Sequence, residues 1–179
     1  QTCALPISEN ELKYLHSVLT NILNVDNYSG IEDIKNELVE TEYIKIKKHG
    51  KTKKVKPTKP RHFMSSDGID IYVGRNNIQN DLLTLKFANK NDMWLHTKDI
   101  PGSHVIIKNI GDIPENTLLE AGNLSAFYSK SKNSSSVPVD YTQVRNVKKP
   151  SGAKPGMVIY TTNKTIYVTP VESTLERIE

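Results

Sequence analysis

The sequence has only one cysteine, Cys3, and no long apolar run in its 179 residues. A single thiol cannot form an intramolecular disulfide or supply a cysteine-based zinc cluster. No apolar run approaches the roughly 20 residues that a membrane-spanning helix requires. The sequence does not start with a charged segment followed by an apolar one, which is the pattern of a secretion signal. We therefore expect a soluble, cytoplasmic protein with no membrane partner.

The first seven residues, QTCALPI, look like the translation of a sequencing-library adapter. We interpret residues 1–7 as an artefact and leave them out of the fold prediction. On this interpretation the chain is an N-terminally truncated fragment whose biological sequence begins near Ser8. The alternative is a natural but unusual N-terminus.

The distribution of charge is more informative than the net charge of +4. Residues 1–44 hold two basic and eight acidic side chains, whereas residues 45–61 hold nine Lys or Arg and no acid. Gly50, Pro57 and Pro60 predict a loop there, so we interpret residues 45–61 as a basic linker. Such a tract attracts polyphosphate backbones, although a charge run can also be only a solvated loop.

Hydrophobic periodicity predicts two helices before this linker. Apolar residues recur at helical spacing over Glu9–Leu23. Ser29 followed by Glu32 has the pattern of a capping box, and it predicts the start of a second helix there. We treat residues 8–44 as one helical segment.

Residues 62–179 are expected to form one domain. A hairpin of His62–Ser65 and Ile69–Val73 turns at Asp67-Gly68. Asn77–Ala88 is consistent with a short helix or a buried strand, and the helix is favoured. The remaining segments are a helix at Asn116–Lys130 and strands at Asp92–His96, Ser103–Lys108, Tyr141–Val147, Met157–Thr161 and Thr165–Thr169. The predicted fold class is α+β, a mixed and mostly antiparallel sheet with packed helices, preceded by the short helical appendage.

The segment WLHTKDIPGSHVII, residues 94–107, concentrates polar residues at a predicted strand–turn–strand corner. His96 and His104 flank its Pro-Gly turn, and three roles are open: a general acid–base pair, metal ligation with Asp99, or binding of RNA. A structural tie of the turn is the alternative, especially for His104. Recognised catalytic motifs are absent, so we predict no enzyme, no metal and no cofactor. Trp94 is expected in the core.

A second basic cluster lies between Asp140 and Glu172, where the sequence has no acid. Its PSGAKP loop has small residues that allow close approach of backbone N–H groups to phosphate. An arginine and several amides follow the hairpin in GRNNIQND, a composition suited to phosphate contact, base reading or helix capping. The candidate RNA-binding residues are Arg75, Asn76, Asn77, Asn80, His96, Lys98, Ser103, His104, Lys130, Lys148, Lys149 and Lys154.

Three stretches, VGRNNIQND, DMWLHTKDIPGSHVII and AFYSKSKNSSSVPVDYTQVRNVKKPSGAKPGMVIY, closely resemble the RNA-binding domain of the NFACT family. The resemblance implies that residues 62–179 are this domain and that residues 8–44 follow a coiled-coil arm. It also implies a ribosome-associated quality-control role. Family members bind the large ribosomal subunit, through its rRNA, when it carries an obstructed peptidyl-tRNA. They recruit tRNA, mainly through N-terminal domains absent here, and support C-terminal alanine tailing.

The residues also leave two other functions open. One is a metal-independent RNA-processing enzyme that uses His96 and His104. The other is a surface adhesin that binds fibronectin, a role suggested by an older label of the family. The sequence does not identify the RNA element that is bound.

Overall fold

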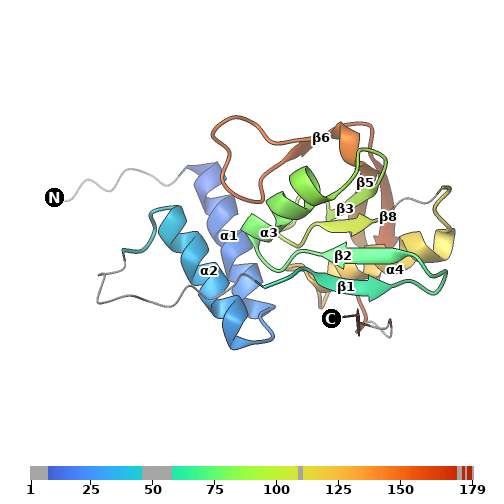
Figure 1. The fold of residues 1–179 in the computed structure, drawn as a ribbon, viewed down its shortest axis with the longest axis horizontal. Helices are drawn as coiled ribbons and strands as arrows, with labels where there is room; N and C mark the ends of the chain where they lie inside the picture. The colour runs from blue at the N-terminus through green and yellow to red at the C-terminus, as the bar shows by residue number, and fades with distance from the viewer. Residues whose placement is uncertain (1–7, 46–57, 109–110, 173–174, 176, 179) are drawn as a thin grey trace.

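The computed structural model describes residues 8–45, 58–108, 111–172, 175 and 177–178. Figure 1 shows a pair of helices packed against one end of a larger body that contains the sheet. The interpretation of residues 1–7 as an artefact lies outside the described residues, and so does most of the predicted basic linker.

The helical appendage consists of α1 (Glu9–Leu23) and α2 (Tyr28–Glu40), and the bounds of α1 are those predicted. The start of α2 corrects the sequence prediction. Asn27, not Ser29, is the N-cap, because its side chain accepts a hydrogen bond from the backbone N–H of Gly30. No helix in the described part of the chain has the length and hydrophobicity needed to cross a membrane.

The sheet has seven strands in the order β8-β5-β3-β4-β2-β1-β9, and every neighbouring pair is antiparallel. The α+β prediction with a mostly antiparallel sheet is therefore confirmed. The strands are β1 (Arg61–Met64), β2 (Asp70–Val73), β3 (Met93–Thr97), β4 (Val105–Ile107), β5 (Val137–Gln143), β8 (Lys164–Val168) and β9 (Arg177–Ile178). A separate two-stranded sheet joins β6 (Val147–Lys148) to β7 (Ile159–Tyr160).

Different elements pack on the two faces of the sheet. Helix α4 (Glu115–Phe127) packs on one face, where Leu124 belongs to the same core cluster as Leu95 and Val105. The other face is covered by α3 (Asn77–Leu82), the π-helical turn η1 (Leu83–Phe87) and the β6–β7 pair. Trp94 is fully buried on this second face, as predicted.

The C-terminal strands differ from the prediction in their bounds. β5 begins at Val137, four residues before the predicted start. The sequence does not predict these residues as strand because proline disfavours strands, but the structure accommodates Pro138 within β5. The predicted strand Tyr141–Val147 is broken at a 3-10 turn, η2 (Val144–Asn146), which redirects the chain into β6. No sequence pattern predicts β9, since two residues carry no periodicity.

Candidate nucleic-acid interface

The basic loop, residues 148–158, is anchored from within the protein. Lys148 is exposed, whereas the Lys149 ammonium donates a hydrogen bond to the Asp81 carboxylate on α3. The backbone N–H of Gly156 donates to the other oxygen of Asp81 at 3.1 Å. One carboxylate therefore holds both ends of the loop, and it neutralises part of the charge that the sequence places there.

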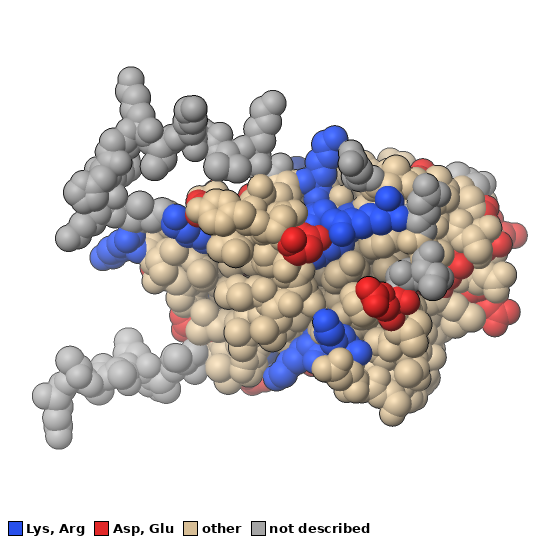
Figure 2. All heavy atoms as spheres, turned by 90° about the horizontal axis from the view of Figure 1, so that it is seen from below, with Lys and Arg blue, Asp and Glu red and all other residues tan. Residues whose placement is uncertain are grey.

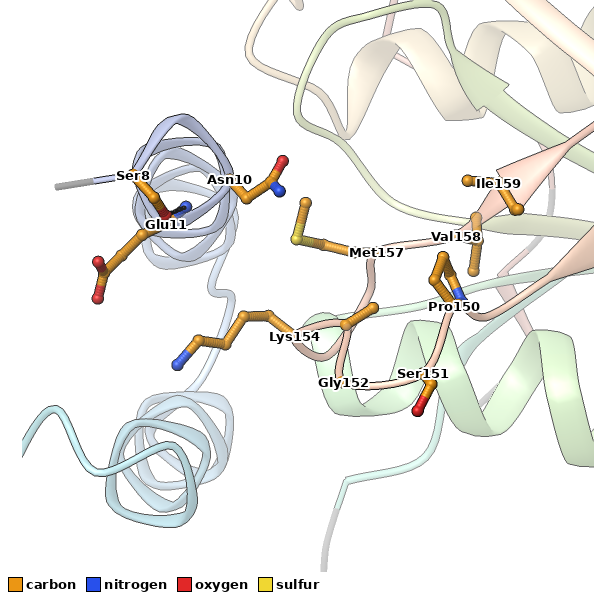
Figure 3. Close-up of a pocket in the computed structure, with 11 residues that line it drawn as sticks. Ser8, Asn10, Glu11, Pro150, Ser151, Gly152, Lys154, Met157, Val158 and Ile159 are labelled. Carbon is orange, nitrogen blue, oxygen red and sulfur yellow. Dashed lines mark hydrogen bonds between the residues drawn. The ribbon is translucent and has the colours of Figure 1, made fainter.

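Lys154 points from the basic loop toward the helical appendage, as Figure 3 shows. Its ammonium lies 4.9 Å from the ring centroid of Tyr43 and 5.8 Å from that of Tyr14. These are cation–π distances, so the lysine joins the loop to the helices. A pocket of about 530 Å³ opens between the first turn of α1 and the loop, with Ser8 and Met157 on opposite sides.

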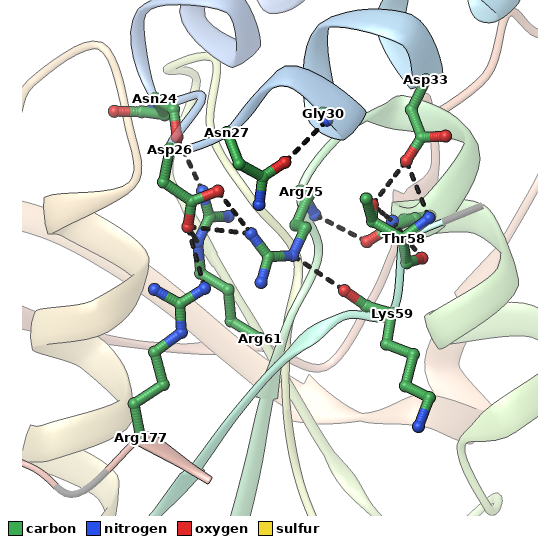
Figure 4. A network of polar contacts seen from close by, with 11 residues as sticks. Asn24, Asp26, Asn27, Gly30, Asp33, Thr58, Lys59, Arg61, Arg75 and Arg177 are labelled. Atoms are coloured by element: carbon green, nitrogen blue, oxygen red, sulfur yellow. Dashed lines mark hydrogen bonds and ion pairs between the residues drawn. The ribbon is translucent and has the colours of Figure 1, made fainter. Parts of the chain in front are cut away.

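Arg75 is part of an internal cluster of three arginines around one carboxylate (Figure 4). Its guanidinium donates to both oxygens of Asp26, at 2.7 and 2.9 Å, and to the backbone oxygen of Lys59. Arg177 donates to the same carboxylate at 2.8 Å, and the Nε atom of Arg61 lies 3.7 Å from it. The structure thus places Arg75 in an ion pair within the protein.

The Asp26 carboxyl has a lowered pKa. Partial burial alone would raise it, but Arg177, Arg61 and Arg75 together outweigh that effect. Arg61 is almost fully buried, and its guanidinium lies 4.2 Å from the ring centroid of Tyr128. Burial lowers the Arg61 pKa to about 10. The cluster therefore depends on Asp26 as its negative charge.

Three of the candidate amide side chains are buried and form hydrogen bonds within the protein. The side chain of Asn76 caps α3, and the side-chain amide of Asn77 donates to Glu37 on α2 at 2.8 Å. The side-chain oxygen of Asn80 accepts from the backbone N–H of His104 at 3.1 Å. Asn76, Asn77 and Asn80 are 1–3% exposed, so they hold α3 in place from within the protein and are not available at the surface.

At the Pro-Gly corner, Ser103 and His104 are also buried. The Nδ1 atom of His104 forms a 2.8 Å hydrogen bond with the Thr84 hydroxyl, which ties the corner to η1. The rings of His96 and His104 lie 5.3 Å apart, edge to face.

Burial lowers the pKa of His96 to about 4 and that of His104 well below its ordinary value. Both imidazoles are neutral near pH 7, which does not suit an acid–base pair. Among the described residues, no group of three His, Cys, Asp or Glu side chains is placed to hold a metal, so His96 and His104 do not form such a group with Asp99.

The exposed candidates are Lys98, Lys130 and Lys148, while His96 is half-buried. Figure 2 shows that Lys and Arg gather in separate groups on the face seen there, with acidic residues beside them. On that face the basic surface is therefore discontinuous. Sequence reasoning missed the Asp26 cluster because Asp26 and Arg177 are 151 residues apart, and no local motif joins them.

The described residues thus form an α+β domain whose basic loop is bonded to α3 and to the helical appendage. The chain belongs to the NFACT family, as the resemblance predicted. The NFACT protein RNA binding domain matches residues 59–162, and the NFACT N-terminal and middle domains match residues 2–57.

Relatives agree with this assignment. The chain is 43% identical over 175 residues to the Rqc2 homolog RqcH of Bacillus subtilis, a match that covers 97% of this chain and 30% of that protein. It is 42% identical over 79 residues to ribosome quality control complex subunit 2 of Schizosaccharomyces pombe, covering 42% of this chain and 8% of that protein. The chain thus spans about three tenths of the bacterial relative's length.

A solved structure has the same fold. It is the C-terminal part of the fibronectin/fibrinogen-binding protein from Streptococcus suis, which matches with a TM-score of 0.85 and 41% identity. The match covers 91% of this chain and 65% of that one. The likeness therefore includes most of the described residues.

Proposed function

We propose that this chain is the RNA-binding module of a ribosome quality-control factor. The match of the NFACT protein RNA binding domain to residues 59–162 carries the proposal. The relatives named RqcH and ribosome quality control complex subunit 2 support the pathway. The module binds and does not catalyse, which agrees with two corner histidines that are neutral near pH 7.

The partner we propose is rRNA of the large ribosomal subunit that carries an obstructed peptidyl-tRNA. In the complete protein the module supports recruitment of tRNA and C-terminal alanine tailing, with other domains making most of the tRNA contacts. It works in the cytoplasm, on the ribosome. The exposed ammonium groups of Lys98, Lys130 and Lys148 make phosphate contacts, because they are the candidate cations that face solvent.

Binding of purified large subunits, measured over a range of salt concentrations, tests this proposal. Each of Lys98→Glu, Lys130→Glu and Lys148→Glu removes one phosphate contact, and each should reduce the slope of log K against log salt by about 0.7–0.9. Lys35→Glu, on an exposed position of α2, is the charge-matched control. If the three variants bind with the affinity and slope of this control, these lysines are not the contact surface.

The likeness to the fibronectin/fibrinogen-binding protein of Streptococcus suis favours a second candidate, binding to fibronectin or fibrinogen. Immobilised fibronectin and fibrinogen test it directly. Adhesin activity predicts binding that persists at about 0.5 M salt, where screening removes most nonspecific attraction of a basic protein. Binding that disappears at that salt concentration would leave the RNA-binding proposal as the better one.

A further inference from the structure

A second cavity, of about 400 Å³, lies beside the Pro-Gly corner. Its walls come from α1, the first residue of α3, strand β3 through Trp94 and His96, the corner at residues 99–102 with His104, and residues 156–158 with Tyr160. The volume falls within the range of about 300–1,000 Å³ that is typical of small-molecule sites. The cavity is thus large enough for one planar heterocycle.

Aromatic rings dominate the interior of this cavity. Trp94 lies 5.7 Å from His96, with the rings nearly parallel, and 4.8 Å from Tyr160. Trp94 is fully buried, yet its indole N–H has no hydrogen-bond partner among the described residues. A buried N–H without an acceptor costs roughly 1–3 kcal/mol, so a ligand that supplies an acceptor is favoured here.

Charge selects against an anion in this cavity. His96 and His104 line it as neutral rings, since burial lowers their pKa values. The lining residues with formal charge are Lys13 and Asp99, which are exposed and opposite in sign. Lys13 is also paired with Glu9 at 2.7 Å. A neutral ligand with hydrogen-bonding edges suits these groups better than a phosphate.

The backbone around the cavity is specialised. Asp99 has φ of +54°, in the left-handed region that few side chains adopt. Gly156 has φ of +77°, and a Cβ there would lie 2.6 Å from the side-chain oxygen of Asn77. Strained or closely packed backbone of this kind is concentrated at binding sites.

We propose that the cavity lined by Trp94, His96 and Tyr160 receives one unpaired nucleobase of the bound RNA. The inference rests on the proposed RNA-binding function and adds a base-recognition site to it. The half-buried rings of His96 and Tyr160 provide stacking surface. The indole N–H of Trp94, which has no partner among the described residues, is the donor for the polar edge of the base.

Trp94 is the only tryptophan, so its fluorescence reports on this cavity alone. The 179-residue chain is titrated with adenosine, guanosine, cytidine and uridine 5′-monophosphates, with excitation at a wavelength selective for tryptophan. Ribose 5-phosphate is the matched probe without a base, and free N-acetyltryptophanamide corrects for absorption by the nucleotides. We expect a saturable change with at least one nucleotide and none with ribose 5-phosphate. No saturable change, or an equal change with ribose 5-phosphate, overturns the proposal.

His96→Ala removes a stacking ring, so it should weaken the nucleotide response roughly fivefold or more, whereas His96→Phe keeps the ring and should retain most of the response. Lys35→Glu, the charge-matched control outside the cavity, should leave this response unchanged. Subunit binding without a fluorescence response contradicts only the nucleobase site. A nucleotide response without salt-dependent subunit binding contradicts the proposed function instead.

Discussion

Two hydrogen bonds join Glu37 and Asn77, although 40 residues separate them in the chain. The Glu37 carboxylate accepts the backbone N–H of Asn77 at 3.1 Å and its side-chain amide at 2.8 Å. It also accepts the Tyr14 hydroxyl at 2.9 Å. This fully buried carboxylate therefore fixes the helical appendage to the first turn of α3.

Removal of that carboxylate should be costly. Glu37→Ala removes the acceptor of three buried hydrogen bonds, although the Tyr14 hydroxyl keeps Thr41 and the Asn77 side-chain amide keeps Ser17 as partners. We expect the free energy of unfolding to fall by about 2 kcal/mol. Urea denaturation of the chain measures this change. Glu40→Ala, at an exposed position of the same helix, is the control and should change stability by less than about 0.5 kcal/mol. Equal effects of the two substitutions would show that the Glu37 carboxylate does not fix the appendage.

Stability should depend on pH through His96. Its folded pKa, about 4, is below that of the unfolded chain because of burial. The unfolded state therefore takes up a proton first as the pH falls below about 6.5, and stability is lost between that pH and about 4. Since the ring is half-buried, we expect a loss of about 1–2 kcal/mol from pH 7.5 to pH 5.

His96→Phe should remove that component of the pH dependence. The comparison between variant and unaltered chain is necessary because the Glu37 pKa is raised by burial. Glu37 therefore makes an opposite contribution, which is present at low pH and is lost as the pH rises through its folded pKa. If the two chains lose the same stability between pH 7.5 and pH 5, His96 is not the source of the loss.

The arginine cluster should depend on its single carboxylate. Asp26→Ala removes the partner of Arg75 and Arg177 and leaves the buried charge of Arg61 uncompensated. We expect a loss of about 2 kcal/mol, because the pairs are partly buried. Thermal unfolding measures it, with Asp112→Ala at an exposed site as the control. A loss no greater than that of the control would show that the cluster does not stabilise the fold.

Two glycines allow a matched steric test. Gly68 and Gly156 both have φ near +75°, but a Cβ added at Gly156 would have neighbours within 3 Å, whereas one added at Gly68 would have none. Gly68→Ala should cost about 1–2 kcal/mol from the backbone alone. Gly156→Ala should cost about 1–3 kcal/mol more, because the methyl group meets Asn77. Equal costs in chemical denaturation would mean that the loop relaxes around the methyl group.

The sequence is a good guide where local physics decides structure. The periodicity over Glu9–Leu23 marks both ends of α1, and Asp67-Gly68 marks the hairpin turn, where Gly68 has φ of +75°. By contrast, β9 exists only because Arg177 and Ile178 pair with β1, which no local pattern encodes. Strand pairing at long separation depends on the whole fold.

The candidate site is harder to predict, for a physical reason. Residue type shows what a side chain is able to bind, but it does not show whether another part of the chain already binds it. Asn77 and Arg75 have suitable chemistry for RNA, and the structure shows them bonded to Glu37 and Asp26. Lys148 is in an equally basic context and is exposed. Long-range partners decide between these outcomes.

The contacts at Asp26 also have a mechanical consequence. Arg177 lies in the last described strand and Asp26 in the loop between the first two helices, so their 2.8 Å contact joins the C-terminal strand to the helical appendage. A pulling force applied to β9 is carried by this guanidinium–carboxylate contact and by the β1–β9 pairing. β9 should therefore leave the sheet under tension only when both contacts have broken.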